Sequence, residues 1–371
     1  MTKIDELYDR QGQSPWLDDL RRDWLADGTL AQWVERGVRG VTSNPSIFQK
    51  AMAAGTAYDD QFTALAKDGC SAVRSYWAMA TTDVADALDL MAPLYRDSGG
   101  ADGFVSLELA PDLAHDTEGS VEAARRLHTD IARPNLLVKI PATDEGVPAV
   151  QRMIAQGSSI NITLIFSLER YAEVMEAYLS GLEELVAHES GAASLARVHS
   201  VASFFISRVD VEIDRRLEAI GSPETLELRG RAAVAQAKLA YRAFRQTFSG
   251  PRWDALAAKG AQVQRPLWAS TSTKSPDYPD TLYIDTLIGP DTVNTMPVAT
   301  LEAFEDHGTL AASAEEGAEE AEALFARLAE LGIDLDEVSR VLEDEGVAAF
   351  AKSFNQGIDA LSEKAAALAE R

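Results

Sequence analysis

The chain has 371 residues, of which 46% are hydrophobic and 25% are charged, and its formal net charge is −25. This composition is typical of a globular protein with a large core, and the negative charge argues against binding of nucleic acids or anionic membranes. The single cysteine, Cys70, excludes a disulfide within the chain and a metal site built from several cysteines. With no apolar signal segment and no stretch apolar enough to span a membrane, we expect a cytoplasmic protein.

Eight short apolar runs predict strands, and the segments between them have the spacing of amphipathic helices. The predicted strands cover residues 14–20, 37–45 (ending in a turn), 104–109, 136–140, 160–166, 198–206, 266–270 and 282–288. The predicted helices cover residues 21–36, a long region from about 47, and then 71–97, 117–132, 144–155, 168–189, about 208–248, 315–331, 335–345 and 347–367. Candidate N-caps are Ser46, Thr117 and Ser167.

The regular alternation of strands and helices predicts a parallel α/β fold, and eight strands favour a closed (β/α)8 TIM barrel with extra helices, especially at the C-terminus. An open, doubly wound sheet is the competing architecture, but the chain contains no Gly-x-Gly-x-x-Gly segment and no P-loop. We expect a single domain, residues 1–371, in which residues 15–297 form the barrel core and residues 298–371 a helical region packed on it.

A lysine interrupts the fourth predicted strand, an apolar run from Leu136 to Ile140 closed by Pro141. Such a run is typical of a strand buried on both faces. Lys139 could extend past the strand end to water or pair with a carboxylate. Alternatively, burial could disfavour its charged form and free the amine to attack a carbonyl group.

Polar residues near the ends of the other predicted strands favour the second interpretation. In a barrel these ends converge on one mouth, where active sites are built. Each residue alone could be a helix cap, a surface ion pair or an ordinary strand residue, but together they suit Schiff-base chemistry at Lys139, which needs groups that transfer protons. The seven positions, including the lysine, are Asp18, Asn44, Glu108, Lys139, Thr163, Ser203 and Ser270.

Four segments resemble the motifs of the transaldolase family: GVTSNPSIF (40–48), LVKIPAT (137–143), INITLIFS (160–167) and SFFISRVD (203–210). The resemblance extends from about residue 15 to the C-terminus, and segment 268–297 is similar to the larger bacterial branch. It implies transfer of a dihydroxyacetone unit from sedoheptulose 7-phosphate to glyceraldehyde 3-phosphate. The products would be erythrose 4-phosphate and fructose 6-phosphate, in the non-oxidative pentose phosphate pathway. It implies sugar phosphate substrates and no metal or organic cofactor, and it leaves both a monomer and a homodimer open.

The resemblance also implies roles for individual residues. Lys139 matches the Schiff-base lysine, Glu108 and Thr163 match the pair that holds the catalytic water, and Asp18 matches the acid/base group, with Asp19 as the alternative. Substrate contacts are implied for Asn44, Ser203, Phe205, Arg208 (at the phosphate) and Ser270. Where many relatives have an arginine after that serine, this chain has none, so Lys274 or Ser272 would replace it.

Three other functions compete with transfer. A related fructose 6-phosphate aldolase would release the three-carbon unit, but such enzymes are much shorter and often use a tyrosine as the acid/base group. A non-catalytic sugar-phosphate sensor would not need both Lys139 and Glu108. A metal-dependent enzyme is disfavoured because the five histidines lack ligand spacing. We expect these at the surface or at helix ends: His115, His128, His188, His199 and His307.

Overall fold

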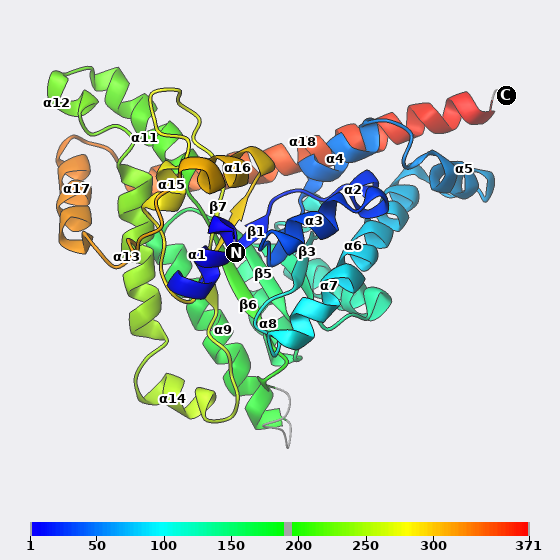
Figure 1. The fold of residues 1–371 in the computed structure, drawn as a ribbon, viewed down its shortest axis with the longest axis horizontal. Helices are drawn as coiled ribbons and strands as arrows, with labels where there is room; N and C mark the ends of the chain where they lie inside the picture. The colour runs from blue at the N-terminus through cyan, green and yellow to red at the C-terminus, as the bar shows by residue number, and fades with distance from the viewer. Residues whose placement is uncertain (1, 189–194, 370–371) are drawn as a thin grey trace.

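The computed structural model describes residues 2–188 and 195–369, and its centre is a closed barrel of parallel strands in sequential order (Figure 1). The strands are β1 (Gln13–Leu17), β2 (Gly40–Thr42), β3 (Phe104–Glu108), β4 (Leu136–Pro141), β5 (Ile160–Ile165), β6 (Ser200–Phe205), β7 (Arg265–Ala269) and β8 (Thr292–Met296). Each strand pairs in parallel with both neighbours, and β8 closes on β1. The predicted (β/α)8 barrel is therefore confirmed.

Large side chains fill the barrel interior. Trp16 of β1 is fully buried, and its indole lies opposite Gly40 of β2. A Cβ atom at Gly40 would come within 2.4 Å of the Trp16 ring, so only glycine admits the indole at this level of the barrel. The ring centroid of Phe104 on β3 lies 6.1 Å from that of Trp16. The barrel interior is thus a packed core, and a binding or active site can form only at its ends.

The eighth predicted strand is wrong. Residues 282–288 contain a short helix, α15 (Leu282–Asp285), and the eighth strand is instead Thr292–Met296. Tyr283, Ile284 and Leu287 are buried, and a short apolar run buried on all sides does not distinguish a strand from a helix. The true strand contains three polar residues among five, Thr292, Asn294 and Thr295, so its sequence looks like a loop.

Helices surround the barrel (Figure 1), and those at Lys3–Gln11, Pro251–Ala257 and Val298–His307 lie outside the predicted helical segments. Before β5 they are α1 (Lys3–Gln11), α2 (Arg22–Asp27), α3 (Thr29–Glu35), α4 (Pro45–Ala53), α5 (Asp59–Lys67), α6 (Ala72–Asp97), the 3-10 turn η1 (Pro111–Leu113), α7 (Thr117–Ile131) and α8 (Gly146–Ala155). After β5 they are α9 (Leu168–His188), α11 (Ser207–Ile220), α12 (Pro223–Leu226), α13 (Ala232–Thr247), α14 (Pro251–Ala257), α16 (Val298–His307), α17 (Ala318–Glu330) and α18 (Leu335–Ala369).

Local chemistry explains most of the boundaries. Ser167 accepts a hydrogen bond from the Arg170 amide, which confirms it as a cap, whereas Asn44 and Asp116 take the places predicted for Ser46 and Thr117. The predicted helix 21–36 is split at Gly28, whose φ of +84° requires a left-handed backbone. Glu189, the predicted end of α9, lies outside the described residues.

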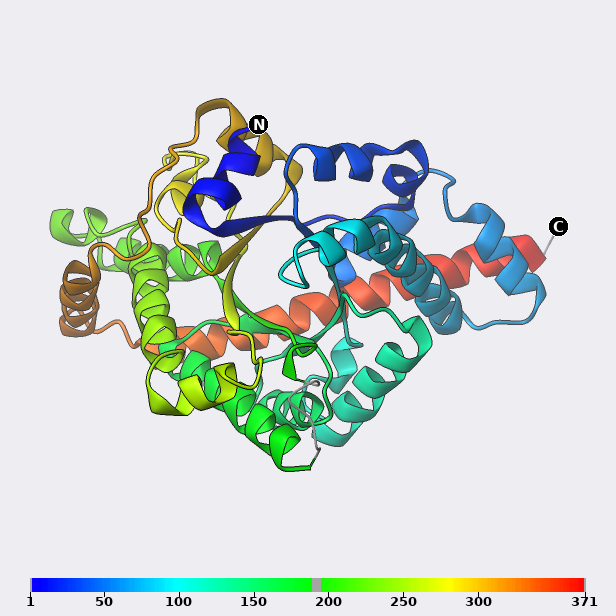
Figure 2. The ribbon, with the colours of Figure 1, turned by 60° about the horizontal axis from the view of Figure 1, so that its bottom comes forward.

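The last long helix, α18, is continuous where two helices were predicted. It packs against α4, α6, α11 and β5, and crosses the end of the barrel at which the strands finish (Figure 2). Gly346 lies within this helix, and a Cβ atom there would come within 2.8 Å of Leu164 on β5. The glycine therefore marks a close approach between helix and barrel, not a helix break.

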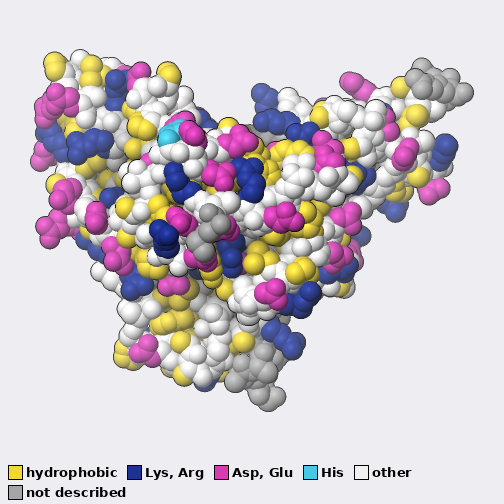
Figure 3. Space-filling model, viewed as in Figure 1, with side chains coloured by type: hydrophobic (Ala, Val, Ile, Leu, Met, Phe, Trp, Pro, Cys, Tyr) yellow, Lys and Arg dark blue, Asp and Glu magenta, His cyan; other side chains and the backbone are white. Residues whose placement is uncertain are grey.

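Exposed acidic side chains account for part of the net charge. Figure 3 shows carboxylates along the edge formed by α17, where Glu319, Glu320, Glu322 and Glu330 are exposed. Among the described helices, none is both long enough and apolar enough to cross a membrane.

Candidate active site

A cavity of about 170 Å³ opens where the strands end and α18 crosses the barrel. Nine of the ten residues predicted to act in catalysis or binding line it, and the tenth, Glu108, contacts Lys139. The lining consists of Asp18, Thr42, Asn44, Lys139, Thr163, Ser203, Phe205, Arg208, Ala269, Ser270, Ser272, Lys274, Thr295, Pro297 and Phe350.

Lys139 and Glu108 form an ion pair inside the barrel. Their strands, β4 and β3, are paired in a register that sets the two residues side by side. The Nζ atom of Lys139 donates to Oε2 of Glu108 at 3.0 Å and to the Ser43 carbonyl at 3.2 Å. The two residues are only 5% and 6% exposed, so Lys139 does not extend to water and instead pairs with a carboxylate beside the cavity.

Burial raises the pKa of Glu108, and the neighbouring Lys139 ammonium only partly opposes this effect. A carboxylate with a raised pKa, in contact with an ammonium group, can accept the ammonium proton and leave a neutral amine. Such a pair can therefore supply a neutral amine, which is the nucleophilic form of a lysine.

Asp18 follows β1 and faces the same cavity. Its Oδ1 atom accepts a hydrogen bond of 2.7 Å from Thr42, and its backbone amide donates to the Met296 carbonyl, which fixes its position. Burial raises the pKa of Asp18, while Thr42 and the charge of Lys139 lower it. Asp19 is absent from the lining, so the strand register favours Asp18 as the group that faces a substrate.

Thr163 is fully buried on β5, and its hydroxyl has no hydrogen-bond partner among the described residues. The next residue, Leu164, has a φ of +60°, and the pairing of β5 with β6 is irregular between Ile162 and Ile165. A β-branched residue could simply belong to the strand, but a buried hydroxyl without a partner suits a group that binds a water or substrate oxygen. The strained backbone beside it supports this assignment.

Asn44 serves as both helix cap and cavity wall. Its Oδ1 atom accepts from the Ile47 amide at 3.0 Å, which caps α4, and its side chain lines the cavity. Ser203 is held differently, because its hydroxyl donates to Asn161 Oδ1 at 2.7 Å and Asn161 in turn donates to Ser106. These bonds fix both polar groups before any substrate arrives.

The cationic part of the site consists of Arg208 and Lys274. The Arg208 guanidinium lies 5.1 Å from the centre of the Phe205 ring, and burial lowers its pKa against the opposing charges of Glu108, Glu345 and Asp18. Lys274 is exposed at the rim, where its Nζ donates to Ser272 at 2.7 Å. Desolvation and the charge of Arg208 lower its pKa, which indicates two cations facing one space.

Sequence reasoning missed five lining residues: Thr42, Ala269, Thr295, Pro297 and Phe350. Thr42 was available as a signal, since it lies inside the GVTSNPSIF segment. Thr295 was missed because β8 was misplaced. Phe350 had no sequence signal, because it belongs to α18, far along the chain from every strand.

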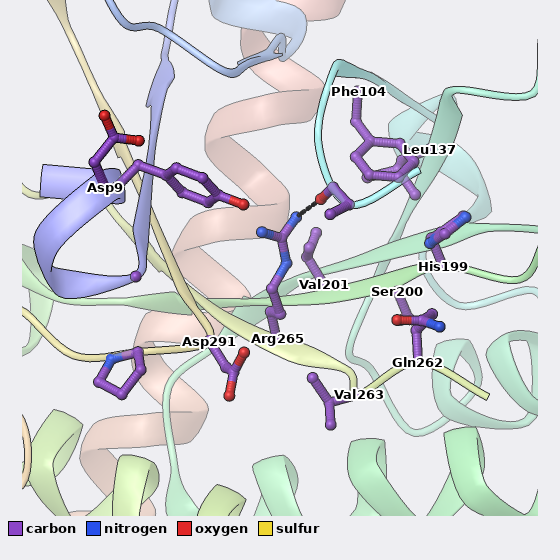
Figure 4. Close-up of a pocket in the computed structure, with 14 residues that line it drawn as sticks. Asp9, Phe104, Leu137, His199, Ser200, Val201, Gln262, Val263, Arg265 and Asp291 are labelled. Atoms are coloured by element: carbon purple, nitrogen blue, oxygen red, sulfur yellow. Dashed lines mark hydrogen bonds between the residues drawn. The ribbon is translucent and has the colours of Figure 1, made fainter. Parts of the chain in front are cut away.

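A larger cavity, of about 410 Å³, lies at the opposite end of the barrel, where the strands begin (Figure 4). Arg265 lies within it, but its guanidinium already donates to Asp102 at 3.2 Å and to the Ala101 carbonyl at 2.7 Å. His199 on its wall is buried against Phe104 and has a pKa lowered by burial to about 4, so its predicted surface position is wrong. The His188 side chain lies outside the described residues. We assign this end a structural role, as is usual for barrels.

Comparison with known proteins agrees with the geometry. A model of the transaldolase/fructose-6-phosphate aldolase family matches residues 15–361. A transaldolase of Mycolicibacterium smegmatis is 53% identical over 351 residues, which are 94% of each chain. Transaldolases of Parafrankia sp. and Thermobifida fusca are 50% and 49% identical, over 95% and 96% of each chain. The chain therefore belongs to the transaldolase/fructose-6-phosphate aldolase family.

Proposed function

We propose that this chain is a transaldolase that moves a dihydroxyacetone unit from sedoheptulose 7-phosphate to glyceraldehyde 3-phosphate through a Schiff base on Lys139. The observation that carries the proposal is the buried contact of 3.0 Å between Lys139 and Glu108 in a cavity that also holds Asp18 and Thr163. The products are erythrose 4-phosphate and fructose 6-phosphate. We also propose that the reaction takes place in the cytoplasm, as part of the non-oxidative pentose phosphate pathway.

The first stage forms the iminium. Glu108 takes a proton from the Lys139 ammonium, and the free amine attacks the ketone carbon of the donor to give a carbinolamine. The carbinolamine loses its hydroxyl group as water, with Glu108 returning a proton to it. The unpartnered Thr163 hydroxyl is available to hold that water.

The second stage breaks and remakes a carbon–carbon bond. Asp18 accepts the proton of the donor hydroxyl, the adjacent bond breaks, and its electron pair moves to the iminium, which becomes an enamine. The shortened aldose leaves, and the enamine attacks the aldehyde of the acceptor as Asp18 returns the proton. Hydrolysis of the new iminium by water then frees the product and restores Lys139. The raised pKa of Asp18 suits a group that must alternate between acid and base.

The phosphate of the substrate is assigned to the cationic part of the cavity. Arg208 can donate two parallel hydrogen bonds to phosphate oxygens, and Lys274 adds a second positive charge. Asn44, Ser203, Phe205, Ser270 and Ser272 complete the substrate contacts in this proposal. A net charge of −25 makes this local concentration of cations necessary for anionic substrates.

The test is reduction with borohydride in the presence of fructose 6-phosphate, followed by intact mass measurement and peptide mapping. We expect a three-carbon adduct on Lys139, and no adduct without the sugar. Turnover should depend on an acceptor aldehyde. Release of free dihydroxyacetone at the same rate without any acceptor would favour the aldolase alternative, and an adduct on another lysine would contradict the proposal.

A further inference from the structure

The segment that carries Lys274 has no regular secondary structure between Ala269 and Leu282, yet the proposed function requires its ammonium group to face Arg208. Partial burial and then the charge of Arg208 lower the pKa of Lys274, so both desolvation and repulsion oppose this placement of its ammonium group. Something must therefore hold this segment over the cavity before the phosphate arrives.

The beginning of the segment is tied to α11. Ser270, with a φ of +56°, accepts a hydrogen bond from the Ser207 amide on its carbonyl at 3.1 Å, and the two hydroxyl groups lie 2.9 Å apart. Ser207 is the first residue of α11 and precedes Arg208. This contact fixes only the near end of the segment.

Two tyrosine–aspartate contacts fix the far end to the same helix. Tyr278 donates to Oδ2 of Asp214 at 2.6 Å, and Tyr283 donates to Oδ2 of Asp210 at 2.8 Å. Asp210 and Asp214 are one turn apart on α11, so both tyrosines attach to the face of the helix that begins beside Arg208.

The aspartates are themselves fixed from the other side. Oδ1 of Asp210 accepts from the Ala233 amide at 2.8 Å, and Oδ1 of Asp214 accepts from the Gly230 amide at 2.9 Å. A Cβ atom at Gly230 would come within 2.7 Å of the Tyr278 ring, so this glycine allows the ring to approach the backbone. In each carboxylate, one oxygen thus accepts from a backbone amide and the other accepts from a tyrosine hydroxyl.

We infer that Tyr278 and Tyr283, bound to Asp214 and Asp210, are positioning residues that hold Lys274 opposite Arg208 for the substrate phosphate. Lys274 lies midway in sequence between the anchors at Ser270 and Tyr278. The inference rests on the proposed function, since it gives the phosphate to Arg208 and Lys274. None of the four residues of the two contacts lines the catalytic cavity, so their effect on a substrate must pass through the segment that they hold.

The test compares Tyr278→Phe with Tyr241→Phe as the matched control. Tyr241 is buried whereas Tyr278 is half-buried, and the Tyr241 hydroxyl donates at 3.0 Å to the Pro290 carbonyl, at the other end of the same connection between β7 and β8. In Tyr278→Phe we expect faster hydrogen exchange in residues 271–281 and a KM for fructose 6-phosphate raised roughly tenfold, with a smaller change in kcat. The KM for unphosphorylated fructose and both properties of Tyr241→Phe should stay near wild type.

A double mutant separates positioning from a general loss of structure. If Tyr278 acts through Lys274, adding Tyr278→Phe to Lys274→Ala should raise the KM no further. Unchanged hydrogen exchange in Tyr278→Phe, or an equal rise in KM in the Lys274→Ala background, would overturn the inference. An unchanged KM in Lys274→Ala alone would overturn the assignment of the phosphate to Lys274, and with it the idea that Lys274 is positioned for phosphate. Faster hydrogen exchange in Tyr278→Phe would in that case still support the anchoring contacts.

Discussion

Lys139 and Glu108 lie on neighbouring strands with their charged atoms 3.0 Å apart, and each is at least nine-tenths buried. Taking two charges out of water is costly, and the pair is tolerated because each partner neutralises the other. The same contact gives Lys139 a proton acceptor within hydrogen-bond reach. The same ion pair therefore affects both the stability of the fold and the proton transfer proposed for Lys139. The variants below separate these two effects.

Replacement of Lys139 should abolish turnover and trapping by borohydride. It should also leave Glu108 buried without its partner, which should make the free energy of unfolding depend on pH. In Lys139→Met, the pKa of Glu108 should rise further, because its opposing charge is lost. Above its ordinary pKa of 4.5, the unfolded chain releases the proton that the folded state retains, so stability should fall as pH rises toward the folded-state value. We expect a loss of up to about 3–5 kcal/mol near neutral pH, measured by denaturant unfolding at several pH values. The double variant Lys139→Met/Glu108→Gln should lose this pH dependence, and its persistence there would contradict the assignment to Glu108.

Glu108→Gln and Thr163→Ala should each lower kcat by roughly 100-fold or more, as expected for proton-transfer groups. If both act through one water, the double variant should lose much less than the product of the two single effects. Steady-state kinetics of the three variants measures this coupling. Strict multiplicativity would indicate that the two side chains serve different steps.

Asp18→Asn should still form the iminium but should cleave the carbon–carbon bond slowly. Borohydride should then trap an adduct that contains the whole donor sugar, which intact mass distinguishes from the three-carbon adduct. Asp19→Asn is the control, because Asp19 does not line the cavity. Accumulation of the whole-donor adduct in Asp19→Asn, with Asp18→Asn near normal, would reverse the assignment.

Arg208→Ala and Lys274→Ala should raise the KM for phosphorylated donors. A hydrogen bond to a charged group contributes about 1.5–3 kcal/mol, or roughly 10- to 150-fold in affinity. The effect of Arg208 should be larger, since a guanidinium can bind phosphate with two parallel hydrogen bonds. Unphosphorylated donors provide the control, and an equal rise in their KM would show that the cations do not recognise phosphate.

Phe350→Ala should open the cavity to water. Phe350 also lines a small void beside it, together with Glu108, Leu164 and Val347, so removal of the ring joins the two spaces. We expect a loss of stability of about 3–5 kcal/mol and a higher ratio of dihydroxyacetone release to transfer, because the intermediate hydrolyses more readily. Phe354→Ala is the matched control: this ring packs on Tyr76 and Trp77 and does not line the cavity, so stability should fall without a change in that ratio.

The sequence predicted the parts of the site that depend on where strands end. Lys139, Glu108 and Thr163 are polar residues in or near the ends of apolar runs, and the structure brings them together. The last strand could not be predicted in the same way, because β8 has few apolar residues and its Thr295 faces the cavity, while the apolar Leu282–Ile288 run is largely buried elsewhere. A local apolar pattern indicates that a segment is buried, but it does not indicate which part of the fold the segment packs against.

The contribution of α18 was beyond sequence reasoning for a related reason. Its apolar stripe indicates that the helix packs on something, but only the folded chain shows that Phe350 lies over the barrel mouth. Gly346 similarly looked like a helix break, although it allows the helix to approach Leu164.

The position of α18 also has a consequence for protein synthesis. All eight strands precede α18 in the chain, so the ribosome delivers the complete lysine-bearing barrel before the helix that covers its mouth. Phe350, which lines the mouth, is therefore synthesised after every strand that positions Lys139, Glu108 and Thr163.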